Sequence, residues 1–105
     1  MQGVSERPDP CRFNDPTSRV LCRHNIKGIR AYAYGSFAVI VLDYVIEMIK
    51  DNRVVKLSDA KKLFADLGKA VFAVDKDLAC EIIEELLKTL KETVKPEYAE
   101  KIIID

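Results

Sequence analysis

Side-chain amides are scarce in this chain of 105 residues, which has one glutamine and three asparagines. Lysine, glutamate, isoleucine and valine are plentiful instead. This usage is typical of hyperthermophile proteins, in which labile side chains are thinned and ion pairs are multiplied. We therefore expect a hyperthermophile protein, a class in which an intracellular disulfide is ordinary.

A net charge is also missing, because 17 basic side chains balance 17 acidic ones. No global field therefore draws the protein onto nucleic acid. The balance is uneven along the chain, since five of the six arginines lie in its first third. Arginine binds phosphate or carboxylate through two parallel hydrogen bonds. This third is the expected contact surface, either for a partner or for acidic helices of the same chain.

The N-terminus shows no apolar stretch of the kind that a secretory signal needs, so we expect a cytoplasmic protein. The longest apolar run, AYAYGSFAVIVL over residues 31 to 42, is interrupted by Asp43 and Glu47. It is too short to cross a bilayer, and an extension would place two carboxylates in hydrocarbon. We interpret it as a core helix and expect no membrane partner.

The chain divides into an irregular N-terminal arm, residues 1 to 27, and a helical bundle domain, residues 28 to 105. Three prolines and the lack of a helical period favour an arm with one short extended piece over residues 19 to 22. The remainder predicts an all-α bundle of three or four helices joined by short loops. No glycine-rich phosphate loop and no internal repeat is present.

The first expected helix spans residues 29 to 50 and is apolar nearly all round, although Ser36 is an alternative start. Its polar positions, Asp43, Glu47 and Lys50, form one narrow stripe, so the helix needs cover on several sides. Ser58 is the expected N-cap of a second helix, and Asp75 or Asp77 that of a third. A short last helix is expected over residues 97 to 103, after Pro96.

Cys11, Cys22 and His24 carry the strongest local chemistry. A Cys11–Cys22 disulfide would close a short loop and hold the arm in place. The alternative is a pair of free thiols or a zinc site, the latter because Cys22 and His24 at i and i+2 of an extended strand point to one side. A fourth ligand would then come from Asp9, Asp15, Cys80 or a second subunit. A nucleophilic Cys22 activated by His24 is a third hypothesis, but no orienting partner is visible.

Arg19 and His24 also resemble the Arg-x4–6-His motif of the HEPN ribonucleases, a family of small all-α RNA-cutting domains. The resemblance covers six residues of 105. It would imply that Arg19 and His24 lie at an RNA phosphate, in a site completed by a dimer. The family motif lies in a helical hairpin, whereas an irregular arm is expected here, so we assign no membership.

Basic and aromatic side chains alternate around the arm. Basic side chains contact phosphates and aromatic side chains stack on bases in nucleic-acid-binding proteins. The nucleic-acid-binding candidates are Arg12, Arg19, Arg23, Lys27 and Arg30. The third helix is acidic, which disfavours its insertion into a DNA major groove.

The leading hypothesis is a small non-enzymatic helical interaction module or complex subunit, because no complete catalytic set is present. We expect a homodimer or another protein partner, and no cofactor unless the arm binds zinc. Nucleic-acid binding through the arm, a HEPN-like ribonuclease and a metal knuckle are the rival hypotheses.

Overall fold

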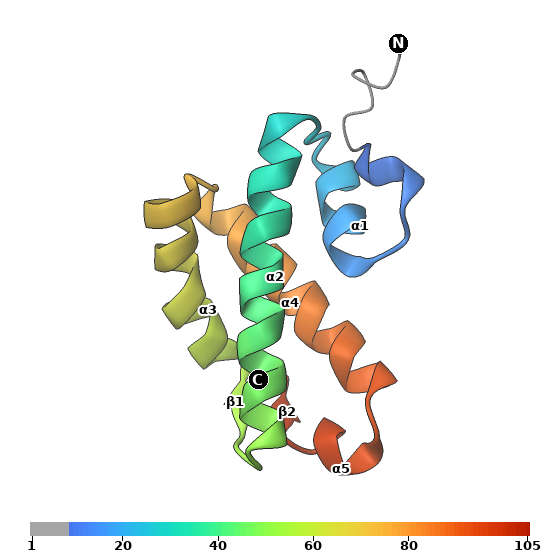
Figure 1. Ribbon diagram of the computed structural model, residues 1–105, viewed down its shortest axis with the longest axis vertical. Coiled ribbons are helices and arrows are strands. Elements are labelled where there is room, and N and C mark those ends of the chain that lie inside the picture. The colour runs from blue at the N-terminus through green and yellow to red at the C-terminus, as the bar shows by residue number, and fades with distance from the viewer. Residues whose placement is uncertain (1–8) are drawn as a thin grey trace.

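The computed structural model describes residues 9–105, which form five α-helices and one pair of very short strands (Figure 1). In chain order these are α1 (Pro16–Arg23), α2 (Ile29–Lys50), β1 (Val55–Lys56), α3 (Leu57–Leu67), α4 (Lys76–Thr93), α5 (Pro96–Ala99) and β2 (Ile102–Ile103). A 3-10 turn, η2 (Pro10–Arg12), and a π-helical segment, η3 (Gly68–Phe72), complete them. The expected all-α bundle is confirmed. The first eight residues of the arm, with Arg7, lie outside the described residues.

The bundle is organised around α2. Helix α4 crosses behind it, while α3 and α1 lie on its two sides (Figure 1). The largest fully buried side chains are Phe37, Ile82, Ile83, Leu87, Ile102, Val20, Val41 and Val45. Val20 and Leu21 of α1 belong to the same hydrophobic cluster as the side chains of α2 and α4. The part of the arm after Asp15 therefore packs into the common core.

Helix α1 replaces the extended piece expected over residues 19 to 22, and that expectation is wrong. The Asp15 carboxylate accepts a hydrogen bond from the Ser18 backbone N–H at 3.1 Å, and Pro16 occupies the first helical position. Both are helix-start signals. The capping carboxylate accepts a backbone N–H that has no partner within the helix, and proline has no backbone N–H that would need a partner. Val20 and Leu21 then become buried against the bundle.

Helix α2 begins at Ile29 rather than at Ser36, and Asp43, Glu47 and Lys50 are exposed as expected. The other elements of the chain cover the apolar surface of α2 only in part. The exposed apolar side chains between residues 29 and 40 are Ile29, Tyr32, Val39 and Ile40. By length and composition α2 could cross a membrane, although 33% of its most apolar window is buried in the bundle and core helices of soluble proteins meet the same criterion.

Two expectations for the C-terminal half are corrected. Ser58 lies inside α3 and donates its backbone N–H and its hydroxyl to the Asp105 carboxylate, at 2.9 and 2.7 Å. The Asp105 carboxylate, which is remote in sequence, thus accepts a backbone N–H that has no partner within the first turn of α3. The last helix ends at Ala99, and Ile102 pairs with Val55 in a parallel ladder instead. Asp75 is confirmed as the cap of α4.

Gly68 permits a close approach between η3 and α2. A Cβ atom built at this position would lie 2.7 Å from Phe37 Cε1 and 2.8 Å from Val74 Cγ2. Both neighbours are buried core side chains, so neither has free space into which to move.

Gly68→Ala is therefore expected to lower the free energy of unfolding by about 1–3 kcal/mol, measured by urea denaturation. The matched control is Gly35→Ala in α2, where an added Cβ meets nothing within 4 Å. That change is expected to raise stability by up to about 1 kcal/mol, because alanine is the better helix former. Equal effects at both positions would contradict the close contact.

Candidate binding groove

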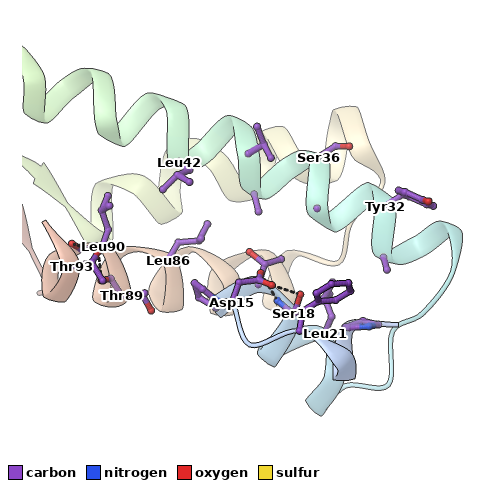
Figure 2. A pocket seen from close by; sticks show the side chains of 18 residues that line it. Asp15, Ser18, Leu21, Tyr32, Ser36, Leu42, Leu86, Thr89, Leu90 and Thr93 are labelled. Carbon is purple, nitrogen blue, oxygen red and sulfur yellow. Dashed lines mark hydrogen bonds between the residues drawn. The ribbon is translucent and has the colours of Figure 1, made fainter. Parts of the chain in front are cut away.

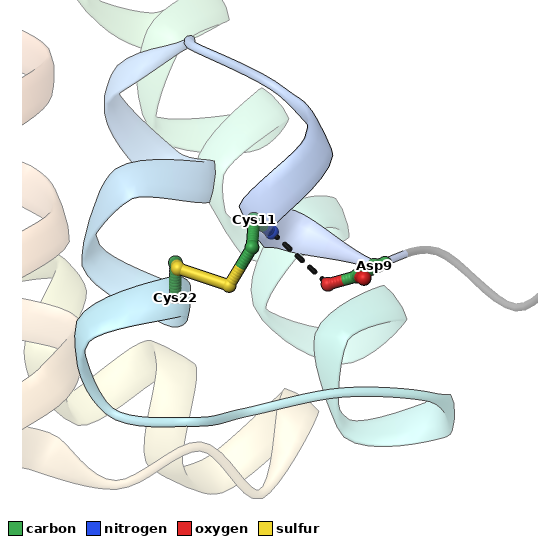
Figure 3. The surroundings of a disulfide bond; sticks show 3 residues. All are labelled: Asp9, Cys11 and Cys22. Carbon is green, nitrogen blue, oxygen red and sulfur yellow. Dashed lines mark hydrogen bonds between the residues drawn. A yellow bond between two sulfur atoms is a disulfide. The ribbon is translucent and has the colours of Figure 1, made fainter.

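Cys11 and Cys22 form a disulfide, with their Cα atoms 4.9 Å apart (Figure 3). The Asp9 carboxylate accepts the Cys11 backbone N–H at 3.1 Å and caps η2. The expected disulfide is therefore present. A cysteine binds a metal ion as its thiolate, which a disulfide does not offer. The zinc hypothesis therefore applies to the reduced protein and stays a prediction.

His24 ends α1 and faces α4 instead of the two cysteines. Its Nε2 atom lies 2.8 Å from Glu81 Oε1. Within residues 9–105, no group of three or more histidine, cysteine, aspartate or glutamate side chains is arranged to hold a metal ion. The expected strand geometry for Cys22 and His24 is wrong, because Cys22 lies in the last turn of a helix and His24 caps it.

Arg19 and Arg23 also face α4. Arg23 Nη2 binds Glu81 Oε2 at 2.7 Å, and Arg19 Nη2 lies 3.8 Å from Glu85 Oε1. Arg19 additionally donates to the Asn14 carbonyl at 2.6 Å. The pairing of arm arginines with acidic helices of the same chain is thus confirmed for these two. Both residues of the Arg-x4-His pattern contact side chains of α4.

Arg12, Lys27 and Arg30 are exposed. Across residues 9–105 none of the three has a carboxylate within 4.0 Å of its charged nitrogen atoms. Nucleic-acid binding through these three side chains stays a prediction.

Glu81 is the shared partner of α1 on α4. The hydrogen bond from Arg23 is the largest influence and lowers the pKa of the Glu81 carboxyl, with His24 adding to it and partial burial opposing it. The ionised carboxylate therefore stabilises the contact between α1 and α4.

Glu81→Gln is expected to lower the free energy of unfolding by about 0.5–1 kcal/mol at neutral pH, since the pair is partly exposed. The folded pKa lies below the unfolded one, so the stabilisation is complete above about pH 5 and disappears as the pH falls through the folded pKa. Urea denaturation from neutral to acidic pH measures it, with Glu92→Gln on the exposed face of α4 as control. A loss that persists unchanged in acid would contradict this assignment.

A groove of about 740 Å³ lies between the arm, α1, α2 and α4 (Figure 2). Most of its lining is apolar or small. The lining residues are Pro10, Phe13, Asp15, Pro16, Thr17, Ser18, Leu21, Ala31, Tyr32, Gly35, Ser36, Ala38, Val39, Leu42, Leu86, Thr89, Leu90 and Thr93. Leu21, Ala38 and Leu86 are buried, whereas Tyr32 and Val39 are 58% exposed. The groove is thus open and continues onto the exposed face of α2.

The polar groups of the groove are largely occupied by the protein itself. Both carboxylate oxygens of Asp15 accept hydrogen bonds from Ser18, at 2.7 and 3.1 Å. The Thr93 hydroxyl donates to the Thr89 carbonyl at 3.0 Å. Among residues 9–105, no buried side-chain nitrogen or oxygen lacks a partner. The groove therefore offers apolar surface and no free acid and base pair.

Sequence reasoning did not find the groove, because its walls come from four segments that are far apart in the chain. The available signal was the N-terminal half of α2, whose apolar side chains exceed what one buried face requires. No family model matches the chain, and neither a curated protein nor a solved structure matches it.

Proposed function

We propose that this protein is a small non-enzymatic interaction module that binds an amphipathic protein helix in the groove between α1, α2 and α4. The observation that carries the proposal is the continuity of the groove with the exposed apolar face of α2. An apolar surface of this kind, rimmed by polar side chains, is typical of protein interaction sites.

The dimensions of the groove suit a helix. Its α2 wall runs from Ala31 to Leu42, which corresponds to about 17 Å, or three helical turns. Gly35 and Ser36 are small and lie midway along this wall, so a docked helix can approach the α2 backbone closely. Leu86 and Leu90 of α4 add apolar surface to the groove.

A second copy of the chain is the proposed partner. Its own α2 carries exposed apolar side chains between residues 29 and 40, including Ile29, which is 72% exposed, and Ile40. A homodimer would cover this surface on both subunits through one self-complementary patch. A bilayer is the less favourable cover, because the exposed Asp43 and Glu47 lie further along the same helix and would be desolvated.

Nuclear magnetic resonance of the ¹⁵N-labelled protein tests helix binding. The probe is a synthetic amphipathic peptide of about 18 residues with leucines at helical spacing. The control peptide has the same composition in a scrambled order. We expect saturable shifts of the Gly35, Ser36 and Thr89 amides with the amphipathic peptide alone.

Two variants sharpen this test. Val39→Glu places a carboxylate in the groove and is expected to weaken binding at least about tenfold. Val71→Glu is the matched control, since Val71 is 62% exposed and lies in η3, outside the groove. Saturable shifts that avoid the groove, or equal shifts with the scrambled peptide, would overturn the proposed function.

A further inference from the structure

Residues 9–13, here called the wall segment, form one side of the groove. Pro10 is buried and Phe13 is 57% exposed, and both line the groove. Pro10 thus packs into the protein, while the Phe13 ring remains available at the rim. An aromatic ring held in such a position supplies a large apolar contact to a bound helix.

The hydrogen bonds of the wall segment are all internal to it. The Arg12 N–H donates to the Asp9 carbonyl at 3.0 Å, and the Phe13 N–H donates to the Pro10 carbonyl at 3.1 Å. The Cys11 N–H donates to the Asp9 carboxylate at 3.1 Å. Within residues 9–105, no hydrogen bond or ion pair connects the wall segment to α1, α2 or α4. The disulfide to Cys22 of α1 is therefore its covalent link to the bundle, beside the packing of Pro10 and the hydrogen bond from Arg19 to the carbonyl of the adjoining Asn14 (Figure 3).

We propose that the Cys11–Cys22 disulfide is a redox switch for the groove. In the oxidised protein it fixes the wall segment and presents Phe13 to the bound helix. A dithiol reductant releases the wall segment and weakens helix binding. This inference rests on the proposed function, because it assigns a regulator to the same groove.

The chemistry is thiol–disulfide exchange. One thiolate of the dithiol attacks the Sγ atom of Cys11, the more exposed residue of the pair, and the Cys11–Cys22 bond breaks. Cys22 leaves as a thiolate and takes up a proton. The second thiol of the reductant then displaces Cys11 from the mixed disulfide. The products are two protein thiols and one cyclic oxidised dithiol, so two electrons and two protons pass to the protein.

The test measures the affinity of the full-length protein for the amphipathic peptide before and after treatment with dithiothreitol. We expect affinity to fall about tenfold on reduction, because the wall must be reordered when the peptide binds. The double variant Cys11→Ser, Cys22→Ser is expected to show the weaker affinity without reductant. Cys80→Ser, which removes the free thiol, is expected to bind and respond as the wild type does.

A further variant distinguishes loss of the wall-segment contact with the peptide from a general loss of packing in the reduced protein. Phe13→Ala is expected to weaken binding in the oxidised protein and to make the effect of reduction smaller, since the lost contact is the same. The amides of α3 and of the β1–β2 pair, which lie outside the groove, report whether the reduced protein stays folded. Their collapse on reduction would overturn the switch, because binding would then follow unfolding.

The outcomes separate this inference from the proposed function. Equal affinity before and after reduction would overturn the switch and leave the helix-binding groove intact. Tighter binding after reduction would also overturn it, because the wall segment would then cover the groove rather than build it. Failure of the oxidised protein to bind the peptide at all, at concentrations where it is a single chain, would overturn the proposed function itself.

Discussion

Phe37→Ala is expected to lower the free energy of unfolding by about 3–5 kcal/mol, the range for deletion of a buried phenylalanine ring. Phe37 is fully buried in α2, and its ring centroid lies 6.3 Å from that of Phe72 in an edge-to-face arrangement. The variant loses this ring contact and leaves a cavity above Gly68 that the packed neighbours cannot fill. Urea denaturation measures the change.

The contact with Gly68 provides an internal check on this prediction. In a Phe37→Ala background, Gly68→Ala no longer meets the ring and places a methyl group in the vacated space. The double variant is therefore expected to be more stable than the sum of the single changes by about 1 kcal/mol or more. Phe37→Leu, which keeps most of the volume, is expected to cost less than about 1.5 kcal/mol. Simple additivity of Phe37→Ala and Gly68→Ala would contradict the described packing.

Loss of the Cys11–Cys22 disulfide has the second largest expected effect. The bond joins residues separated by 11 positions, and closure of such a loop restricts the unfolded chain. The paired change Cys11→Ser and Cys22→Ser is expected to lower the free energy of unfolding by about 3 kcal/mol.

Urea denaturation without reductant gives this difference, and Cys80→Ser is the control that keeps the disulfide. Treatment of the wild type with dithiothreitol is expected to reproduce the loss. A difference below about 0.5 kcal/mol would mean that packing of the wall segment alone holds the loop.

Where local chemistry decides, the fold is predictable from the sequence. The capping of α4 by Asp75 and the Glu84–Lys88 pair, at 2.8 Å, each depend on residues within four positions of one another. Hydrophobic periodicity and capping act over that range, so a sequence pattern contains them. The start of α2, which has no side-chain cap, stays open between Ile29 and Ser36 in the sequence.

The missed features depend on distant residues or on an overlooked cap. Asp15 and Pro16 are helix-start signals, but α1 has only eight residues, and the nearby prolines and cysteines favour an irregular arm. The pairing of Val55 with Ile102 joins two-residue strands that carry no alternating pattern. The cap that Asp105 supplies to Ser58 is likewise remote.

The candidate site divides in the same way. The spacing of Cys11 and Cys22 makes a disulfide one of several hypotheses, beside a zinc site, and the structure decides for the disulfide. The partners of Arg23 and His24 could not be assigned to Glu81 from sequence, since the α1–α4 contact spans more than fifty positions. The groove itself exists only once four segments are packed together.

Sedimentation velocity of the oxidised protein over a wide concentration range tests most directly whether the groove face of α2 is a docking surface for a second copy. The expected mass approaches twice the 11.9 kDa of one chain as the concentration rises towards about 1 mM. Val39→Glu is expected to stay at the mass of one chain, whereas Val71→Glu is expected to follow the wild type. A single-chain mass for the wild type at every concentration, or dimerisation of Val39→Glu equal to that of the wild type, would contradict this account.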